Sequence, residues 1–241
     1  MSTPQAHEKP LTLAALQPGY LPWLGYFDQL RRADVFIHYD DVQYDKHGWR
    51  NRNRIKSAKG EPHWLTVPVL HGGRDWPQVR EVEIDARAPW GRKHAGTLRQ
   101  FYAAAPHFAE YFPALEAFLL RDWRRLMDLD LALVDLLAGF LGIETRTAFS
   151  SQLGIPGSGS LRLVEICRHL GATSYLTGDA AKDYLDTAGF ASQGIEVVWQ
   201  SYRHPEYPQL HGAFVPYLSI VDLLFNCGPD SLRILKQGQP E

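Results

Sequence analysis

Residues 17–26 have the composition of a site that binds an anionic group. They read Gln-Pro-Gly-Tyr-Leu-Pro-Trp-Leu-Gly-Tyr, beginning at Gln17, and lead from an apolar run into a helical pattern. The N-terminus of a helix offers free N–H groups and partial positive charge, so phosphates and carboxylates bind there. Gly25 would let a ligand approach the backbone, while Tyr20 and Tyr26 can stack or donate hydrogen bonds. The alternative is a proline–glycine turn whose aromatic rings belong to the core.

Three arginines alternate with asparagines at residues 49–54, which read Trp-Arg-Asn-Arg-Asn-Arg. At the period of a strand, Arg50, Arg52 and Arg54 share one face, and Asn51 lies on the other. A guanidinium can donate two parallel hydrogen bonds to a phosphate or carboxylate. This run, with Trp49, therefore predicts binding of a small anionic substrate such as a nucleotide-linked sugar or a phosphopantetheine tether. A solvated basic edge strand is the alternative.

Two adjacent acids, Asp40 and Asp41, follow the second predicted strand, with Gln43 and Tyr44 close behind. A carboxylate pair at a strand end could orient an amine or act as a general base, so both acids are assigned a catalytic role. Gln43 and Tyr44 are assigned to substrate binding. We predict no metal, because no neighbouring histidine or carboxylate completes a ligand set. The alternative is that the acids cap the start of a loop.

Two later turns could also contact an anionic substrate. Ser158 and Ser160 precede a helix, although a serine N-cap would explain them equally. Gly178 follows a strand in the same way, with Lys182 and Tyr184 just beyond. A lysine in the first helical turn is disfavoured by the helix dipole, which suggests that Lys182 neutralises a ligand. A solvated lysine is the alternative.

A proline-rich segment at residues 202–216 concentrates polar aromatic side chains, among them His204, Tyr207, Gln209 and His211. Proline prevents full pairing in a sheet, and loops of this kind often line sites. We expect His204 to be the acid or base, since histidine titrates near neutral pH, and Tyr207 and Gln209 to contact the substrate. A structural or surface role for either histidine is the alternative.

An α/β pattern must position these residues. Residues 11–16 and 33–40 read as strands, and residues 23–33 between them read as an amphipathic helix. A strand, helix and strand within thirty residues form a βαβ unit with parallel strands. Strand–helix alternation returns after residue 146 and ends in a helix at 218–228. This favours a doubly wound, mostly parallel sheet, whose ligands lie at the carboxyl ends of the strands.

Between the two α/β regions we expect a different pattern. Residues 41–63 are polar and predict a loop, whereas residues 63–70 and 79–85 predict strands. Residues 89–143 carry apolar side chains at helical spacing and predict a helical insertion. Residues 1–10 are expected to be a disordered tail, and residues 11–241 a single α/β domain with that insertion.

The composition restricts the function. The 241 residues carry 25 Lys plus Arg against 27 Asp plus Glu, and this net charge of −2 argues against nonspecific nucleic-acid binding. No apolar run approaches a membrane span and no signal peptide is recognisable, so we expect neither membrane insertion nor export. Two isolated cysteines, Cys167 and Cys227, fit reduced thiols in the cytoplasm.

The entry of the fold resembles the nucleotidylyltransferase superfamily, in which a first strand leads to a His-x-Gly-His tetrad that binds ATP phosphates. Here residues 23–26 read Trp-Leu-Gly-Tyr, so the glycine is kept and both histidines are absent. Tryptophan and tyrosine cannot supply the cation that stabilises a transferring phosphate. The resemblance therefore implies the fold but puts adenylyl transfer in question.

Several motifs in order resemble the WbqC-like family of bacterial proteins over about residues 11–228. They are Gln17-Pro-x-Tyr-x-Pro-Trp-x-Gly-Tyr-Phe27, Tyr39-Asp-Asp-Val-Gln-Tyr44, Trp49-Arg-Asn-Arg52, Tyr175-Leu-x-Gly-x-x-x-Lys182-x-Tyr-Leu, His204-Pro-x-Tyr-Pro-Gln209 and Leu218-Ser-Ile-x-Asp-Leu-Leu-Phe-Asn226. The family is associated with O-antigen, surface-polysaccharide and natural-product biosynthesis.

This resemblance implies a biosynthetic transferase that attaches an acyl or aminoacyl group to an amine, such as an amino sugar. The donor would be activated on an acyl-carrier protein through phosphopantetheine, on coenzyme A, or by ATP as an adenylate. Two alternatives stay open from the residues alone. One is a degenerate nucleotidylyltransferase acting on a phosphorylated small molecule, and the other is a non-catalytic binding or scaffold protein.

Overall fold

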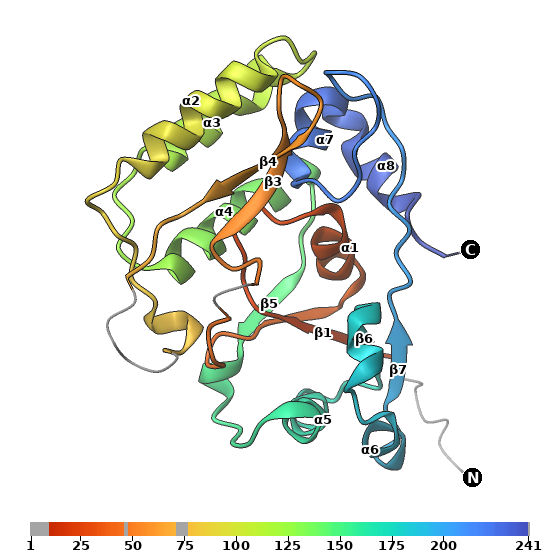
Figure 1. Cartoon of the computed structure of the whole chain (residues 1–241). Helices are drawn as coiled ribbons and strands as arrows, with labels where there is room; N and C mark the ends of the chain where they lie inside the picture. The colour runs from red at the N-terminus through yellow and green to blue at the C-terminus, as the bar shows by residue number, and fades with distance from the viewer. Residues whose placement is uncertain (1–9, 46–47, 71–76, 241) are drawn as a thin grey trace.

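A five-stranded parallel sheet forms the centre of the protein (Figure 1). The computed structural model describes residues 10–45, 48–70 and 77–240; the predicted tail lies, but for its last residue, outside this range. The sheet consists of β1 (Thr12–Leu16), β2 (Val35–His38), β5 (Arg146–Phe149), β6 (Ser174–Thr177) and β7 (Glu196–Trp199). Every pairing between these strands is parallel, and their order is β5-β2-β1-β6-β7. The predicted α/β class with a parallel sheet is therefore confirmed.

The strand order changes direction at β1. The next two sheet strands along the chain, β2 and β5, lie on one side of β1, whereas β6 and β7 lie on the other. In open parallel sheets, ligands bind outside the carboxyl ends of the strands at such a switch point. The strand order therefore predicts that a ligand site, if the protein has one, lies near the ends of β1 and β6.

Consecutive side chains of the strands pack into two separate cores. Ala14 belongs to a core that includes α1 (Leu24–Arg32), whereas Leu13 belongs to one that includes α5 (Gly159–Leu170) and α6 (Thr187–Ser192). Figure 1 shows α5 and α6 on one side of the sheet and α1 on the other. Because side chains alternate along a strand, an apolar run such as residues 12–16 must be covered on both faces.

A long connection between β2 and β5 carries a hairpin and three helices. The hairpin pairs β3 (Arg52–Lys56) with β4 (Pro62–Thr66) in antiparallel register. The helices are α2 (Trp90–Tyr102), α3 (Phe108–Leu119) and α4 (Leu126–Leu141), which lie in the range where apolar spacing predicts helices. Their apolar faces join the core on the α1 side of the sheet.

Two expectations for this connection are wrong. The predicted loop at 41–63 contains β3, because Asn53 and Ile55 of that strand turn inward while Arg52 and Arg54 stay partly exposed. The predicted strand at 79–85 instead begins with the 3₁₀ turn η1 (Val79–Glu81). The Gln78 N–H donates to the Glu81 carboxylate at 3.2 Å and the Glu81 N–H donates to the Gln78 carbonyl oxygen at 2.9 Å, and these local hydrogen bonds compete with strand pairing.

The chain ends with two helices on the α1 side of the sheet. After β7, residues 200–217 lead to α7 (Ile220–Cys227) and α8 (Ser231–Lys236). Helix α7 contacts α3, α4 and β3, and α8 contacts α1. The helical turn expected to contain Lys182 is a 3₁₀ turn, η3 (Asp179–Asp183), and a second turn, η2 (Ser150–Leu153), follows β5. Across the described residues, no helix combines the length and hydropathy needed to cross a membrane.

Candidate functional site

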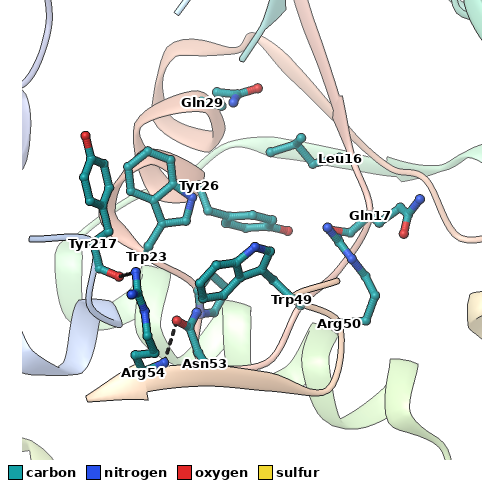
Figure 2. Close-up of a pocket in the computed structure, with 12 residues that line it drawn as sticks. Leu16, Gln17, Trp23, Tyr26, Gln29, Trp49, Arg50, Asn53, Arg54 and Tyr217 are labelled. Atoms are coloured by element: carbon teal, nitrogen blue, oxygen red, sulfur yellow. Dashed lines mark hydrogen bonds between the residues drawn. The ribbon is translucent and has the colours of Figure 1, made fainter. Parts of the chain in front are cut away.

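A pocket opens at the carboxyl end of β1, in the region where the switch point places a ligand. Its volume is about 350 Å³, within the ~300–1,000 Å³ that is usual for small-molecule sites. Its walls come from the segment after β1, from α1, from the approach to β3 and from the segment before α7 (Figure 2). The lining residues are Leu16, Gln17, Gly19, Pro22, Trp23, Tyr26, Gln29, Trp49, Arg50, Asn53, Arg54 and Tyr217.

Backbone hydrogen bonds hold three distant segments around this pocket. The Tyr20 N–H donates to the carbonyl oxygen of Arg50 at 3.0 Å, which ties the segment after β1 to the approach to β3. The Ser219 N–H donates to the carbonyl oxygen of Arg54 at 2.8 Å, which ties the C-terminal segment to β3. The pocket is thus formed by hydrogen bonds between segments that are distant in the sequence, and not by one continuous motif.

Two residues beside the pocket hold an unfavourable backbone conformation. Leu21 has φ of 45° and Tyr217 has φ of 58°, in the left-handed region that side chains normally avoid. Side chains of β3 bind their carbonyl oxygens: the amide of Asn53 donates to Leu21 at 2.7 Å, and Arg54 donates to Tyr217 at 3.3 Å. Such strain costs roughly 1–3 kcal/mol per residue and concentrates at functional sites.

Aromatic rings dominate one part of the pocket wall. The ring of Trp23 packs edge-on against Tyr202 and lies 5.7 Å, centroid to centroid, from Tyr217. A Cβ atom on Gly25 would lie 2.2 Å from the Trp23 ring, so the glycine is needed for this indole to pack. The Gly25 backbone therefore supports an aromatic wall, whereas the sequence suggested direct approach by a ligand.

The three predicted arginines differ in their roles. Arg50 lines the pocket, and its Nη1 donates to the carbonyl oxygens of Gln17 at 2.7 Å and Pro18 at 3.1 Å. The guanidinium carbon of Arg52 lies 4.8 Å from the ring centroid of Trp64, and that of Arg54 lies 5.2 Å from the ring centroid of Trp49. Arg50 and Arg54 therefore bring two positive charges to the pocket, while Arg52 lies beside it.

Trp49 and Trp64 form an exposed platform at the pocket edge. Their rings lie 5.1 Å apart, and they remain 44% and 43% exposed. Large exposed aromatic rings stacked with guanidinium groups are suited to a flat, anionic ligand. Because Trp49 also lines the pocket, the platform continues the pocket outward.

Several polar atoms of the pocket are buried and have no hydrogen-bond partner among the described residues. They are Gln17 Oε1, Tyr26 OH, Gln29 Oε1, Arg50 Nε and Arg54 Nε. Burial raises the pKa of Tyr26 far above its usual value, so its hydroxyl stays protonated. Buried polar groups are normally paired, and these atoms therefore indicate a partner that is supplied by solvent or by a ligand.

Asp130 on α4 is a buried acid that sequence reasoning missed. It is fully buried, and within the described ranges neither carboxyl oxygen has a hydrogen-bond partner. Burial raises the pKa of Asp130 well above its usual value, while the charge of Arg50 lowers it. The acid lies four residues after Leu126 and three before Leu133, on the apolar face of the helix, and that spacing could have revealed it.

The predicted acid pair is engaged away from the pocket lining. The Asp40 carboxylate accepts a hydrogen bond from the hydroxyl of Ser150 at 2.9 Å and from the hydroxyl of Ser151 at 2.6 Å. Asp41 forms a two-pronged ion pair with Arg162 of α5, with N–O distances of 2.8 and 2.5 Å. The pair thus ties the end of β2 to η2 and α5, and its catalytic role stays a prediction.

The predicted residues of the two later turns also lie outside the pocket lining. Lys182 forms an ion pair with Asp179 at 2.5 Å and is half exposed. Tyr184 is 74% exposed, and Ser158 is also exposed. The Ser160 hydroxyl accepts from a backbone N–H of residue 186 at 3.0 Å. Gly178 is closer to the site, because a Cβ there would lie 3.4 Å from Nε2 of Gln29, which lines the pocket.

The C-terminal candidates His204, Tyr207 and Gln209 do not line the pocket. The ring of His204 lies 5.3 Å from that of Tyr217, a lining residue, and burial lowers the pKa of His204. Tyr207 donates to the buried carboxylate of Asp222 at 2.9 Å. The Gln209 amide oxygen accepts from Nζ of Lys56 at 3.2 Å and from a backbone N–H of residue 215.

The remaining predicted binding residues have individual positions. Tyr20 is buried, and its hydroxyl is hydrogen-bonded to Nδ1 of His94 at 2.8 Å. Asn51 donates to the carbonyl oxygen of residue 67 at 2.8 Å. Tyr44 is buried, whereas Gln43 is exposed. In the part of the chain that the structure describes, no cluster of three or more His, Cys, Asp or Glu could hold a metal ion.

Comparison with known proteins finds one family model and one similar protein. The model of the WbqC-like protein family matches residues 17–234. A protein of Mycobacterium tuberculosis (strain ATCC 25618 / H37Rv), named "Uncharacterized protein Rv1507c", is 41% identical over 230 residues, which cover 93% of this chain and 99% of that protein. No solved structure matches the chain.

Proposed function

Because the chain belongs to the WbqC-like protein family, we propose that it is a biosynthetic transferase that attaches an acyl or aminoacyl group to an amine. The pocket at the end of β1 binds the activated donor. One observation supports this proposal above the others: two guanidinium groups and four aromatic rings converge in a single pocket at the switch point of the sheet. This combination suits a donor that joins an anionic group to a flat ring.

The pocket divides the donor between two regions. The phosphate of the donor binds to Arg50 and Arg54, near the N-terminus of α1. A base or pantetheine portion continues outward over Trp49 and Trp64. A nucleotide-linked donor, coenzyme A and the phosphopantetheine of an acyl-carrier protein share this pattern of anion and extended group.

The transfer requires one bond exchange. The acceptor nitrogen attacks the donor carbonyl carbon, a C–N bond forms, and the C–O bond of an adenylate or the C–S bond of a thioester breaks. The leaving group departs as AMP or as a thiol, and the nitrogen loses its surplus proton to the thiolate or to water. Arg50 and Arg54 stabilise the negative charge of the donor and of its leaving group during this step.

Binding and turnover test this proposal together. Wild-type protein is mixed with AMP, coenzyme A or UDP-N-acetylglucosamine, and its melting temperature is measured, because a ligand that binds the folded form raises it. Arg54→Gln should bind about tenfold more weakly or worse, since a charged hydrogen bond is lost. Arg87→Gln is the matched control, because the Arg87 side chain is 83% exposed and paired with Asp85.

Two results would contradict the proposal: no thermal shift with any of the three probes, or equal binding by the Arg54→Gln and wild-type proteins. Amide formation is followed by mass spectrometry, with an amino sugar as acceptor and a thioester or adenylate as donor. The same assay tests the predicted acids and bases. Asp40→Asn, Asp41→Asn, Lys182→Met and His204→Gln would each abolish amide formation if these side chains were catalytic.

A degenerate nucleotidylyltransferase is the second candidate. It is favoured by the position of the pocket, which lies between the first strand and the first helix of a sheet with order β5-β2-β1-β6-β7. Against it stands the absence of both tetrad histidines from residues 23–26. Release of pyrophosphate from ATP or CTP without amide formation would select this candidate.

A further inference from the structure

A buried glutamine of α1 brings an unpaired oxygen atom to the pocket. Gln29 lines the pocket, although the residue is only 4% exposed. Its amide oxygen Oε1 is buried and has no hydrogen-bond partner among the described residues. A buried amide oxygen is costly unless a hydrogen bond satisfies it, so this atom points to a ligand that donates a hydrogen.

A chain of hydrogen bonds fixes which end of the Gln29 amide is left for a ligand. The amide nitrogen of Gln200, the residue after β7, donates to the carbonyl oxygen of Gly25 at 2.7 Å and to the Asp28 carboxylate at 3.0 Å. Both partners are acceptors, so the other end of the Gln200 amide is its oxygen. That oxygen accepts from Nε2 of Gln29 at 2.8 Å, which leaves Oε1 of Gln29 as the unpaired end.

The charges around the pocket favour a ligand group without positive charge. Arg50 and Arg54 both line the pocket, and no acid does so in the described parts of the chain. Asp28, the acid next to Gln29 in the sequence, is paired with Arg31 at 3.0 Å and with Arg32 at 3.3 Å. A cation in the pocket would therefore be repelled by two guanidinium groups, and no carboxylate of the lining would offset that repulsion.

An amine meets both requirements only in its uncharged form. A neutral amine donates through its N–H bonds and keeps one lone pair, whereas an ammonium group has donors but no lone pair. Because Oε1 of Gln29 accepts a hydrogen, the lone pair of an amine bound there stays free to attack a carbonyl carbon. We infer that Gln29 binds the acceptor amine of the transfer in its uncharged, nucleophilic form, and that Arg50 and Arg54 disfavour the ammonium form.

This inference rests on the proposed transferase function and assigns the second substrate of the same pocket. Figure 2 shows Gln29 and Arg54 at opposite ends of the residues drawn, with the rings of Trp23 and Tyr26 between them. A donor phosphate at the guanidinium groups therefore leaves Gln29 to the acceptor. The Trp23 ring can pack against the apolar face of a sugar, and the Tyr26 hydroxyl, which also lacks a partner among the described residues, can bond to an oxygen of either substrate.

Titration of the full chain with amino sugars, followed by ligand-observed NMR, tests the inference. The probes are glucosamine, mannosamine and galactosamine, each compared with the 2-deoxy sugar that has hydrogen in place of the amine, with and without AMP. At least one amino sugar should bind at least about fivefold more tightly than its deoxy counterpart, which leaves the Gln29 oxygen unpaired. Below the pKa of the free amine, its affinity should fall about tenfold for each pH unit, whereas that of the deoxy sugar stays constant.

A variant isolates the amide from the rest of the pocket. Gln29→Met keeps the length of the side chain but removes the amide, so the preference over the deoxy sugar should disappear. Gln193→Met is the matched control, because Gln193 is exposed and outside the pocket lining, and it should bind like wild type. The pH series needs only the wild-type protein, so it tests the inference even if Gln29→Met does not fold.

Three results would overturn the inference. They are equal binding of every amino sugar and its deoxy counterpart, an affinity for amino sugars that does not rise with pH, and an unchanged preference in Gln29→Met. If AMP or coenzyme A still raised the melting temperature in that case, the donor site would stand and only the role of Gln29 would be lost. If neither class of probe bound, both proposals would fall.

Discussion

Replacing Asp130 with asparagine should make the ligand-free protein more stable, which is unusual for a substitution in the core. The side chain is 0% exposed and its carboxyl oxygens find no hydrogen-bond partner in the described structure. Asparagine has nearly the same shape but cannot ionise, so the variant avoids the free energy that is needed to keep this buried acid protonated above its ordinary pKa. One pKa unit of such a shift is worth about 1.4 kcal/mol, and the expected gain at pH 7 is about 1–3 kcal/mol.

The gain should depend on pH in a definite direction. Burial raises the pKa of Asp130 in the folded protein above that in the unfolded chain. Below the unfolded pKa of about 3.9 the acid is protonated in both states, and the wild type carries no penalty. As the pH rises above that value, the unfolded chain releases the proton first, so the wild type loses stability and asparagine does not.

Urea denaturation of both proteins between pH 5 and pH 8 measures this difference. A gain of 1–3 kcal/mol corresponds to a rise of about 2–12 °C in melting temperature for a chain of this size. Asp128→Asn, at an exposed acid of the same helix, controls for the loss of one negative charge. If Asp130→Asn destabilised the protein, or if the gain were the same at every pH, the account of an unpaired buried acid would be refuted.

Three further predictions concern residues around the site. Asn53→Ala removes the amide that donates to the carbonyl oxygen of the strained Leu21, so the free energy of unfolding in urea should fall by about 1–3 kcal/mol. The variant should also lose binding of AMP or coenzyme A, and unchanged binding would show that the strained backbone does not support the pocket. Asp41→Asn breaks the ion pair with Arg162 and should cost about 1–3 kcal/mol of stability, with the difference from wild type shrinking as the pH falls through the lowered pKa of Asp41. Burial lowers the pKa of His94 to about 4, so on acidification the unfolded chain binds a proton before the folded protein does. The free energy of unfolding should therefore fall by up to about 3 kcal/mol between pH ~6.5 and pH ~4. Urea denaturation over this pH range would contradict the prediction if His94→Gln lost as much stability as the wild type.

The first βαβ unit could be predicted from the sequence because its signals are local. An apolar run at 12–16 and helical spacing at 24–32 determine their own elements, and the parallel sheet follows from their alternation. Gln17 and Tyr26, which the sequence places at the junction of strand and helix, both line the pocket, and their role in binding a substrate stays a prediction.

Long-range partners explain what the sequence could not show. β3 appears polar, but the buried amide of Asn53 and the backbone N–H of Lys56 are paired with residues 21 and 102. Asp41 was correctly placed at a strand end, yet Arg162, 121 residues away, binds its carboxylate. Asp130 lies in a correctly predicted helix, but Arg50, whose charge lowers the pKa of this acid, comes from a distant part of the sequence.

The hydrogen bonds that join distant segments around the pocket have a consequence for folding kinetics. The Ser219 amide is bonded to the carbonyl of Arg54 across 165 positions of the chain, so this contact closes a very long loop. Contacts of such separation are slow to form, which makes the binding-competent state a late product of folding. Hydrogen exchange at the Ser219 and Tyr20 amides would then report the assembly of the pocket apart from that of the sheet.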